Sequence, residues 1–213
     1  EKVSVPVAVH LDHGDSFERC MEMLKIGFTS IMYDGSAYPV EENARRTEEV
    51  GKVCRAFGVP LEAEIGELAR LDDQGRAMGC SNIADPEVVR QYLTLCRPDS
   101  LAIGIGNAHG FYKGPVDIRV EVLEECRKFT DIPFVLHGCT GMDEGLIRRA
   151  INAGVAKINF GTQIRCQYVE YLKEGLAEGK DEGHAWKLSR FAEEKLRGDI
   201  RDIIRLAGSE GKA

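Results

Sequence analysis

Short apolar runs alternate along the chain with longer segments in which apolar residues recur at helical spacing. The runs predict strands at residues 5–9, 29–33, 60–65, 100–105, 133–137 and 156–160. The helical spacing, with capping residues or glycines at its ends, predicts helices at 17–26, 39–57, 85–96, 117–129, 143–152 and 185–206. A polar segment at 66–84 shows neither pattern and is expected to be irregular. Strands that alternate with helices predict a parallel sheet covered by helices, and hence the α/β class.

The first predicted strand leads into a cluster of polar residues. The apolar run 5–9 continues into His10-Leu11-Asp12-His13-Gly14, so we expect a buried strand that delivers polar groups into a site. Side chains alternate along a strand, which places His10 and Asp12 on one face and His13 at the turn into the loop. Taken alone, this motif fits a metal ligand beside an acid/base carboxylate and a buried hydrogen-bonded cluster equally well.

Polar residues also mark the ends of the later strands. They are Asp34, Glu64, His109, His137 and Asn159 to Thr162. Successive strands that all carry chemistry at the same end are typical of a β/α barrel, whereas a doubly wound sheet concentrates it near one switch point. We therefore expect a TIM (β/α)8 barrel. Such a barrel has eight strands and the pattern yields six, the first of them close to Glu1, so we expect a piece of a longer polypeptide.

Composition narrows the class of protein. A chain of 213 residues with 43% apolar and 30% charged residues fits one soluble domain spanning 1–213. A net charge of −7 and the lack of a basic block argue against a nucleic-acid partner. No apolar stretch approaches the ~18 residues of a membrane span, and no signal peptide opens the sequence. Seven cysteines without a C-x-x-C pair indicate reduced thiols in a cytoplasmic protein.

Histidines supply the first candidate chemistry. His13, His109 and His137 each follow a strand end, so a barrel would bring them together. Three neutral imidazoles with an open fourth position form the donor set of a catalytic zinc site. Each histidine could instead be a separately satisfied polar residue, but their equivalent positions favour the metal site. His10 is expected to support a ligand or to belong to the core, and His184 to lie on the surface.

Two late strand-to-helix turns predict an anion site. Small residues in 138–141 and 159–162 let backbone N–H groups approach a phosphate, and the helix N-termini add favourable dipoles. Barrels often bind phosphate at their last two strands. Plain turn chemistry explains the glycines but not Asn159 in an apolar strand. Gly104-Ile105-Gly106 is not a dinucleotide fingerprint, because His109 replaces the third glycine and no helix opens there.

Six motifs carry a resemblance to a known family. They are His10-Leu11-Asp12-His13-Gly14, Tyr33-Asp34-Gly35-Ser36, Glu62-Ala63-Glu64-Ile65-Gly66, Asn107-Ala108-His109-Gly110, Val135-Leu136-His137-Gly138 and Lys157-Ile158-Asn159. In this order they resemble the class II, zinc-dependent ketose-bisphosphate aldolases, in particular the fructose- and tagatose-bisphosphate aldolases. The tail at 203–209 also looks like the C-terminal helix of that family, so the resemblance covers nearly the whole chain.

The resemblance implies an activity and its residues. The reaction is reversible cleavage of a ketose 1,6-bisphosphate to dihydroxyacetone phosphate and an aldehyde such as glyceraldehyde 3-phosphate, a step of glycolysis and related carbohydrate metabolism. His13, His109 and His137 match the zinc ligands, and Asp12 matches the acid/base carboxylate. Positions that match the dihydroxyacetone phosphate site are Gly110, Gly138, Cys139, Thr140, Asn159, Gly161 and Thr162. The family commonly forms dimers or tetramers.

Asp34 and Glu64 match carboxylates that bind a second cation, divalent or monovalent, in some members of the family. They fit equally well as buried partners of neighbouring histidines.

The sequence departs from the family in two places. The proton-shuttling loop of the family usually carries paired glycines and acidic residues, and the glycines are absent at 67–73. Asp72 or Asp73 is the counterpart of the base in that loop. Family members also have about two β/α units before the strand that ends in Asp12-His13, so we expect this barrel to lack its first two units.

Three other functions compete with a zinc aldolase. Lys157, the only strand lysine, would suit a Schiff-base aldolase, but three histidines argue for metal. A truncated, inactive paralogue that serves as a subunit or phosphate-binding module would explain the altered loop. A zinc hydrolase with a barrel fold usually carries a His-x-His pair on an early strand. The corresponding residues here are His10 and Asp12, which disfavours that function.

Overall fold

A computed structural model describes residues 3–66, 69–71, 77–78, 83–110 and 117–212. Its elements, in chain order, are β1 (His10–Gly14), α1 (Phe17–Lys25), β2 (Ser30–Tyr33), α2 (Val40–Phe57), β3 (Leu61–Ile65), β4 (Ala69–Leu71), β5 (Ala77–Met78), α3 (Pro86–Leu95), β6 (Ser100–Ile103), β7 (Ala108–His109), α4 (Val120–Arg127), β8 (Phe134–Leu136), α5 (Glu144–Asn152), β9 (Val155–Ile158), α6 (Thr162–Ala177) and α7 (Ala185–Leu206).

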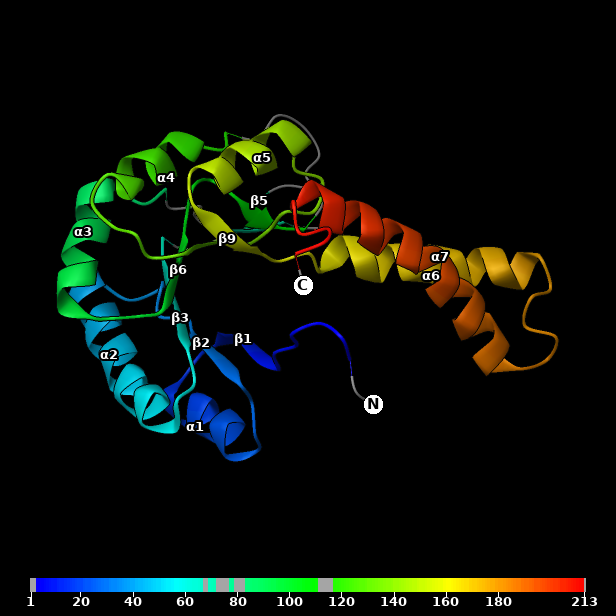
Figure 1. Cartoon of the computed structure of the whole chain (residues 1–213), viewed down its shortest axis with the longest axis horizontal. Coiled ribbons are helices and arrows are strands. Elements are labelled where there is room, and N and C mark those ends of the chain that lie inside the picture. Colours follow the sequence, from blue (N-terminus) through cyan, green and yellow to red (C-terminus); the bar gives the residue numbers. More distant parts are fainter. Residues whose placement is uncertain (1–2, 67–68, 72–76, 79–82, 111–116, 213) are drawn as a thin grey trace.

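The main sheet is a curved half-barrel. Its strands run in the order β1-β2-β3-β6-β8-β9, and every neighbouring pair is parallel. Figure 1 shows α1 to α5 along the outer side of this curve, while α6 and α7 form a hairpin that extends away from it. The prediction of an α/β fold with a parallel sheet is confirmed.

Strand alternation separates an outer from an inner face of the half-barrel. Ile31 packs with residues of α1 and α2, and Leu101 and Phe134 pack with residues of α3 and α4. The next residue along each of these strands belongs to a separate cluster, which consists of Met32, Ala102 and Val135. The interior face therefore holds a small apolar cluster, with Glu62 and Lys157 in register beside Met32 and Val135 and further polar side chains above it.

Two strand predictions are wrong. The run 5–9 is not a buried strand: β1 begins at His10, and Val5, Val7 and Val9 are 47%, 70% and 51% exposed. Because β1 is an edge strand, the residues leading into it have a neighbouring strand on one side only. Segment 66–84 is not wholly irregular, since β4 and β5 join β7 in a second, three-stranded sheet. Strands of two or three residues are too short for an alternation of apolar and polar residues to be recognised in the sequence.

Local signals placed most helices correctly. The side chains of Ser16, Asp85 and Asp143 accept backbone N–H groups at the starts of α1, α3 and α5. Helix α4 begins at Val120 rather than at 117. Within the described ranges, none of the helices combines the length and apolar composition that a membrane crossing demands.

Arg127 ties the starts of the last two main strands to α4. Its guanidinium donates to the carbonyl oxygens of Thr130, Ala153, Ile132 and Gly154 at 3.0–3.3 Å. The guanidinium carbon also lies 4.3 Å from the centre of the Phe134 ring. This one side chain therefore satisfies carbonyl groups that precede β8 and β9.

Replacing Arg127 with Met is expected to lower the free energy of unfolding by about 2 kcal/mol, because several carbonyl groups lose a charged donor. Urea denaturation followed by circular dichroism measures the change. Arg149→Met is the matched control, since Arg149 pairs with Glu124 on the surface and its loss should cost below about 1 kcal/mol. Equal losses in the two variants would contradict this role for Arg127.

Candidate metal centre and its cavity

A β-bulge in β1 shapes the centre. His10 and Leu11 pair with Ser30 and Ile31, but Gly14 pairs with Tyr33, so β1 has one extra residue between these points. Within the bulge, His13 has a φ of 53°, a left-handed conformation that is rare outside glycine. The strand thus continues past the position where a turn was expected at His13.

The bulge changes where two side chains point. On a regular strand Asp12 and His13 would face opposite sides of the sheet. In this structure both line the same cavity. The bulge therefore presents a carboxylate and an imidazole together, which simple alternation does not allow.

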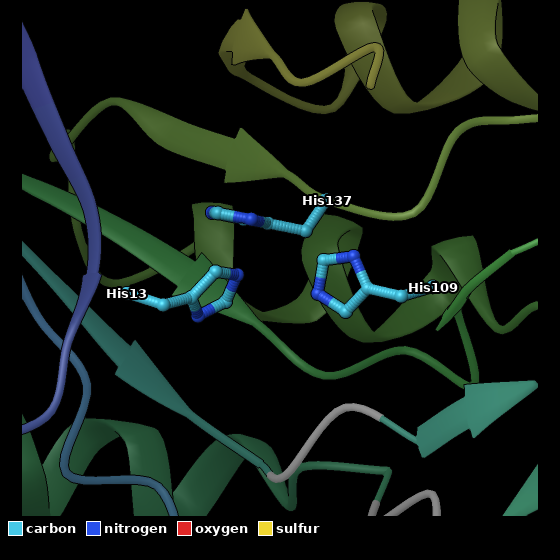
Figure 2. Close-up of side chains that lie close together, drawn as sticks. All are labelled: His13, His109 and His137. Carbon is cyan, nitrogen blue, oxygen red and sulfur yellow. The ribbon is translucent and has the colours of Figure 1, made fainter. Parts of the chain in front are cut away.

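Three histidines meet at this point, as the sequence predicted. The ring centre of His13 lies 5.0 Å from that of His109 and 4.7 Å from that of His137, and the latter two are 6.0 Å apart. One nitrogen of each ring lies within 4.8 Å of the others. Figure 2 shows the three side chains gathered together from separate parts of the chain. This spacing suits ligands of a single ion.

Asn107 and Gly138 bring His109 close to His137. The buried Asn107 side chain accepts from the N–H of Ile105 and donates to the carbonyl oxygen of His137 at 2.8 Å. Gly138 has a φ of 66°, and a Cβ at this position would lie 2.4 Å from the carbonyl oxygen of Ala108. Only glycine permits this approach of the two backbones.

A carboxylate fixes the orientation of His13. Nδ1 of His13 lies 2.8 Å from Oδ2 of Asp34 and 3.5 Å from Oε2 of Glu64. Burial by itself lowers the pKa of His13, but the hydrogen bond to Asp34 and nearby carboxylates outweigh it and raise the pKa above 6.5. Burial raises the pKa of Asp34, yet hydrogen bonds from His13 and Ser36 lower it to about 2.

The surroundings of Nε2, the other ring nitrogen of His13, indicate whether a metal ion fits. Nε2 of His13 is buried and has no hydrogen-bond partner among the described residues; Asp12 Oδ1 lies 3.9 Å away. A buried nitrogen without a partner costs free energy, which an ion at this point would remove. Since His109 and His137 lie beside this nitrogen, the residues present fit a metal ion.

His137 is oriented by a second buried carboxylate. Nε2 of His137 lies 2.9 Å from Oε1 of Glu62, so this nitrogen donates and Nδ1 is the unprotonated nitrogen. Nδ1 lies 3.1 Å from Nδ2 of Asn159, which also donates to Oδ1 of Asp12 at 3.1 Å. Asn159 thus links the carboxylate of Asp12 to the histidine cluster.

The centre opens into a cavity of about 570 Å³. Among the predicted substrate-binding residues, those that line it are Gly110, Gly138, Thr140, Asn159, Gly161 and Thr162. Cys139 does not, because its buried Sγ lies 3.5 Å from the carbonyl oxygen of Leu136, and burial raises its thiol pKa to about 12. Asp72 and Asp73 fall outside the described residues.

The cavity also contains residues that the sequence analysis missed. Asp15, Ser36 and Ala37 follow β1 and β2, and Arg165 lies in the first turn of α6. Arg165 is the only lysine or arginine among the described residues of the lining, which also includes the carboxylates of Asp12, Asp34 and Glu64. Its position three residues after Thr162 is the one signal that could have revealed it.

The comparisons with known proteins agree on one family. The family model "Fructose-bisphosphate aldolase class-II" matches residues 1–212. A probable fructose-bisphosphate aldolase of Bacillus subtilis (strain 168) is 38% identical over 212 residues, covering 100% of this chain and 74% of the relative. The sulfofructosephosphate aldolase of Alkalicoccus urumqiensis is 34% identical over 212 residues, covering 99% and 74%.

Solved structures agree as well. The crystal structure of the YdjI aldolase from Escherichia coli K12 superimposes with a TM-score of 0.82 at 31% identity, covering 100% of this chain and 72% of that one. The resemblance that the six motifs indicated is confirmed over almost every residue of the chain. This protein belongs to the class II fructose-bisphosphate aldolase family.

Proposed function

We propose that this chain is a zinc-dependent aldolase. It reversibly cleaves a ketose 1,6-bisphosphate of the fructose or tagatose type to dihydroxyacetone phosphate and an aldehyde such as glyceraldehyde 3-phosphate. The observation that carries the proposal is the meeting of His13, His109 and His137 beside Asp12 in one cavity. The family and its named aldolases support the reaction type.

The proposal also covers the domain, the barrel, the cellular location and the oligomeric state of the enzyme. We take residues 1–213 as one aldolase domain and the six-stranded sheet as part of an eight-stranded barrel, which its curvature and open edges at β1 and β9 support. We also propose a cytoplasmic location, which the six free thiols among the described cysteines support. A dimer or tetramer is part of the same proposal.

A zinc ion held by His13, His109 and His137 would supply Lewis-acid stabilisation of the negative charge that develops on the ketone oxygen. Asp34 and Glu64 orient His13 in this scheme. They remain candidates for a second cation, because one oxygen of each lies near His13 in a second potential ligand group.

Asp12 acts as the acid/base group. During cleavage its carboxylate takes the proton of the C4 hydroxyl while the C3–C4 bond breaks and its electron pair stays on C3. During condensation the same proton returns to the aldehyde oxygen. The Asp12 side chain is 55% exposed and lies at the cavity, so it reaches substrate directly. Asn159 holds Oδ1 of Asp12 in place. Protonation of C3 needs a second acid, for which we keep Asp72.

The phosphate would bind at the ends of β8 and β9. Gly138, Thr140, Gly161 and Thr162 line this side of the cavity, and α6 begins there. Arg165 adds a positive charge to a lining that is otherwise rich in carboxylates. Relatives with fructose-bisphosphate and sulfofructosephosphate aldolase names support a sugar phosphate as the substrate class.

Removal of metal is expected to abolish activity. Treatment with a chelator should stop cleavage of fructose 1,6-bisphosphate or tagatose 1,6-bisphosphate, and Zn²⁺ should restore it, because no lysine lines the described part of the cavity. A coupled assay for dihydroxyacetone phosphate measures both steps. Borohydride with substrate should leave the enzyme active, and covalent trapping would instead indicate a Schiff base. Phosphate-ligand binding without turnover would favour the inactive paralogue.

Asp12→Asn is expected to reduce kcat roughly 10²–10⁴-fold, the usual contribution of a positioned acid/base group. Bound zinc should remain near one equivalent per chain, since Asp12 is not one of the three proposed ligands. Steady-state kinetics and metal analysis test the two statements separately. Unchanged kcat would exclude Asp12 from proton transfer.

Arg165→Met is expected to raise KM for the phosphorylated substrate roughly tenfold or more, because a charge-assisted hydrogen bond to phosphate is lost. The effect on kcat should be smaller. Arg190→Met, on the exposed face of α7, serves as the control and should leave KM unchanged. A KM equal to that of the unmodified enzyme would remove Arg165 from the phosphate site.

A further inference from the structure

Half-buried Lys157 and buried Glu62 form an ion pair behind the histidine cluster. Nζ of Lys157 lies 2.9 Å from Oε2 of Glu62, and Oε1 of the same carboxylate lies 2.9 Å from Nε2 of His137. The side chain of Glu62 is 2% exposed and that of His137 is 0% exposed. Oε2 of Glu62 thus faces Lys157, with Nε2 of His10 at 3.7 Å, and Oε1 faces His137.

This contact crosses the interior of the half-barrel. Glu62 lies in β3 and Lys157 in β9, which are separated in the sheet by β6 and β8. Nζ of Lys157 also lies 3.5 Å from Nε2 of His10, whose Nδ1 lies 2.7 Å from Oγ of Ser30. Lys157 therefore connects both edges of the sheet to Glu62.

The buried carboxylate of Glu62 needs a positively charged partner. A buried carboxylate is costly unless it is paired and hydrogen-bonded, and Lys157 is the lysine or arginine within 4 Å of Glu62 in the described part of the chain. An ammonium group on Oε2 also leaves Oε1 directed at His137. Without it, Oε2 would lose its counter-charge and keep only the 3.7 Å contact to Nε2 of His10.

We infer that Lys157 is a positioning residue: through Glu62 it holds His137 as the Nε2–H tautomer, with Nδ1 turned to the metal centre. The inference rests on the proposed function, because it assigns Lys157 to metal binding. It accounts for a lysine in a barrel strand without a Schiff base, since Nζ contacts Glu62 and does not line the cavity.

The first test measures zinc affinity by competition with a chromophoric chelator. Glu62→Gln and Lys157→Met should each weaken zinc binding roughly 10–100-fold, the usual effect of removing a partner of a ligating histidine. Lys157→Arg should retain most of the affinity. Lys173→Met is the matched control, because Lys173 pairs with Glu170 on the surface of α6 and should bind zinc as the unmodified protein does.

The double variant tests whether Lys157 acts through Glu62. If it does, Glu62→Gln combined with Lys157→Met should bind zinc no more weakly than Glu62→Gln alone. The inference would be overturned if the double variant lost zinc affinity by the product of the two single-variant factors. It would also be overturned if Lys157→Met bound zinc as tightly as the unmodified protein. Thermal unfolding confirms that each variant is folded at the assay temperature.

A measurement on the metal-free protein distinguishes failure of this inference from failure of the proposed function. Long-range ¹H–¹⁵N spectra of the metal-free protein should show His137 as the Nε2–H tautomer, and Lys157→Met should shift it towards a mixture. An unchanged tautomer in Lys157→Met would overturn the inference. If the unmodified protein shows this tautomer but binds no zinc, the proposed function fails while the positioning contact remains.

Discussion

The bulge at Asp12 and His13 is the constraint on which the centre depends. One extra residue in β1, taken up by a left-handed backbone at His13, directs a carboxylate and an imidazole into the same cavity. Such a conformation disfavours folding by about 1–3 kcal/mol and persists where surrounding contacts over-determine it. Here those contacts are the bond from the His13 N–H to Sδ of Met32 and the bond between its ring and Asp34.

Two carboxylates, half-buried Asp34 and buried Glu62, orient the histidines. Asp34 binds Nδ1 of His13 and leaves its Nε2 towards the centre, whereas Glu62 binds Nε2 of His137 and leaves its Nδ1 there. The two imidazoles therefore present opposite nitrogens to one point. Each carboxylate is itself held, Asp34 by Ser36 and Glu62 by Lys157, so the histidines rest on a connected polar network.

The charges of the cavity lining fall into two groups that suit the proposed phosphorylated substrate. Carboxylates concentrate on the side formed by β1, β2 and β3. Small residues, helix α6 and Arg165 occupy the side formed by β8 and β9. The two kinds of charge are thus separated across the cavity, and a substrate with one metal-binding and one anionic end matches this division.

The sequence alone determined the order of the six strands of the main sheet and of the helices between them, the helix caps at Ser16, Asp85 and Asp143, and the family. It also identified the three histidines, because residues at the carboxyl ends of parallel strands must meet. Local patterns fix these features, since each depends on spacing within one segment or on motifs that stand in a set order.

Only the tertiary structure decided how the groups point. An extra residue in β1 has no period that marks it, and the exclusion of the Cys139 thiol from the cavity depends on packing around Leu136. The pairing of Lys157 with Glu62 depends on the curvature of the sheet, which brings non-neighbouring strands together. Contacts across the interior of a half-barrel are set by register and curvature, and neither is encoded in the spacing of residues along one strand.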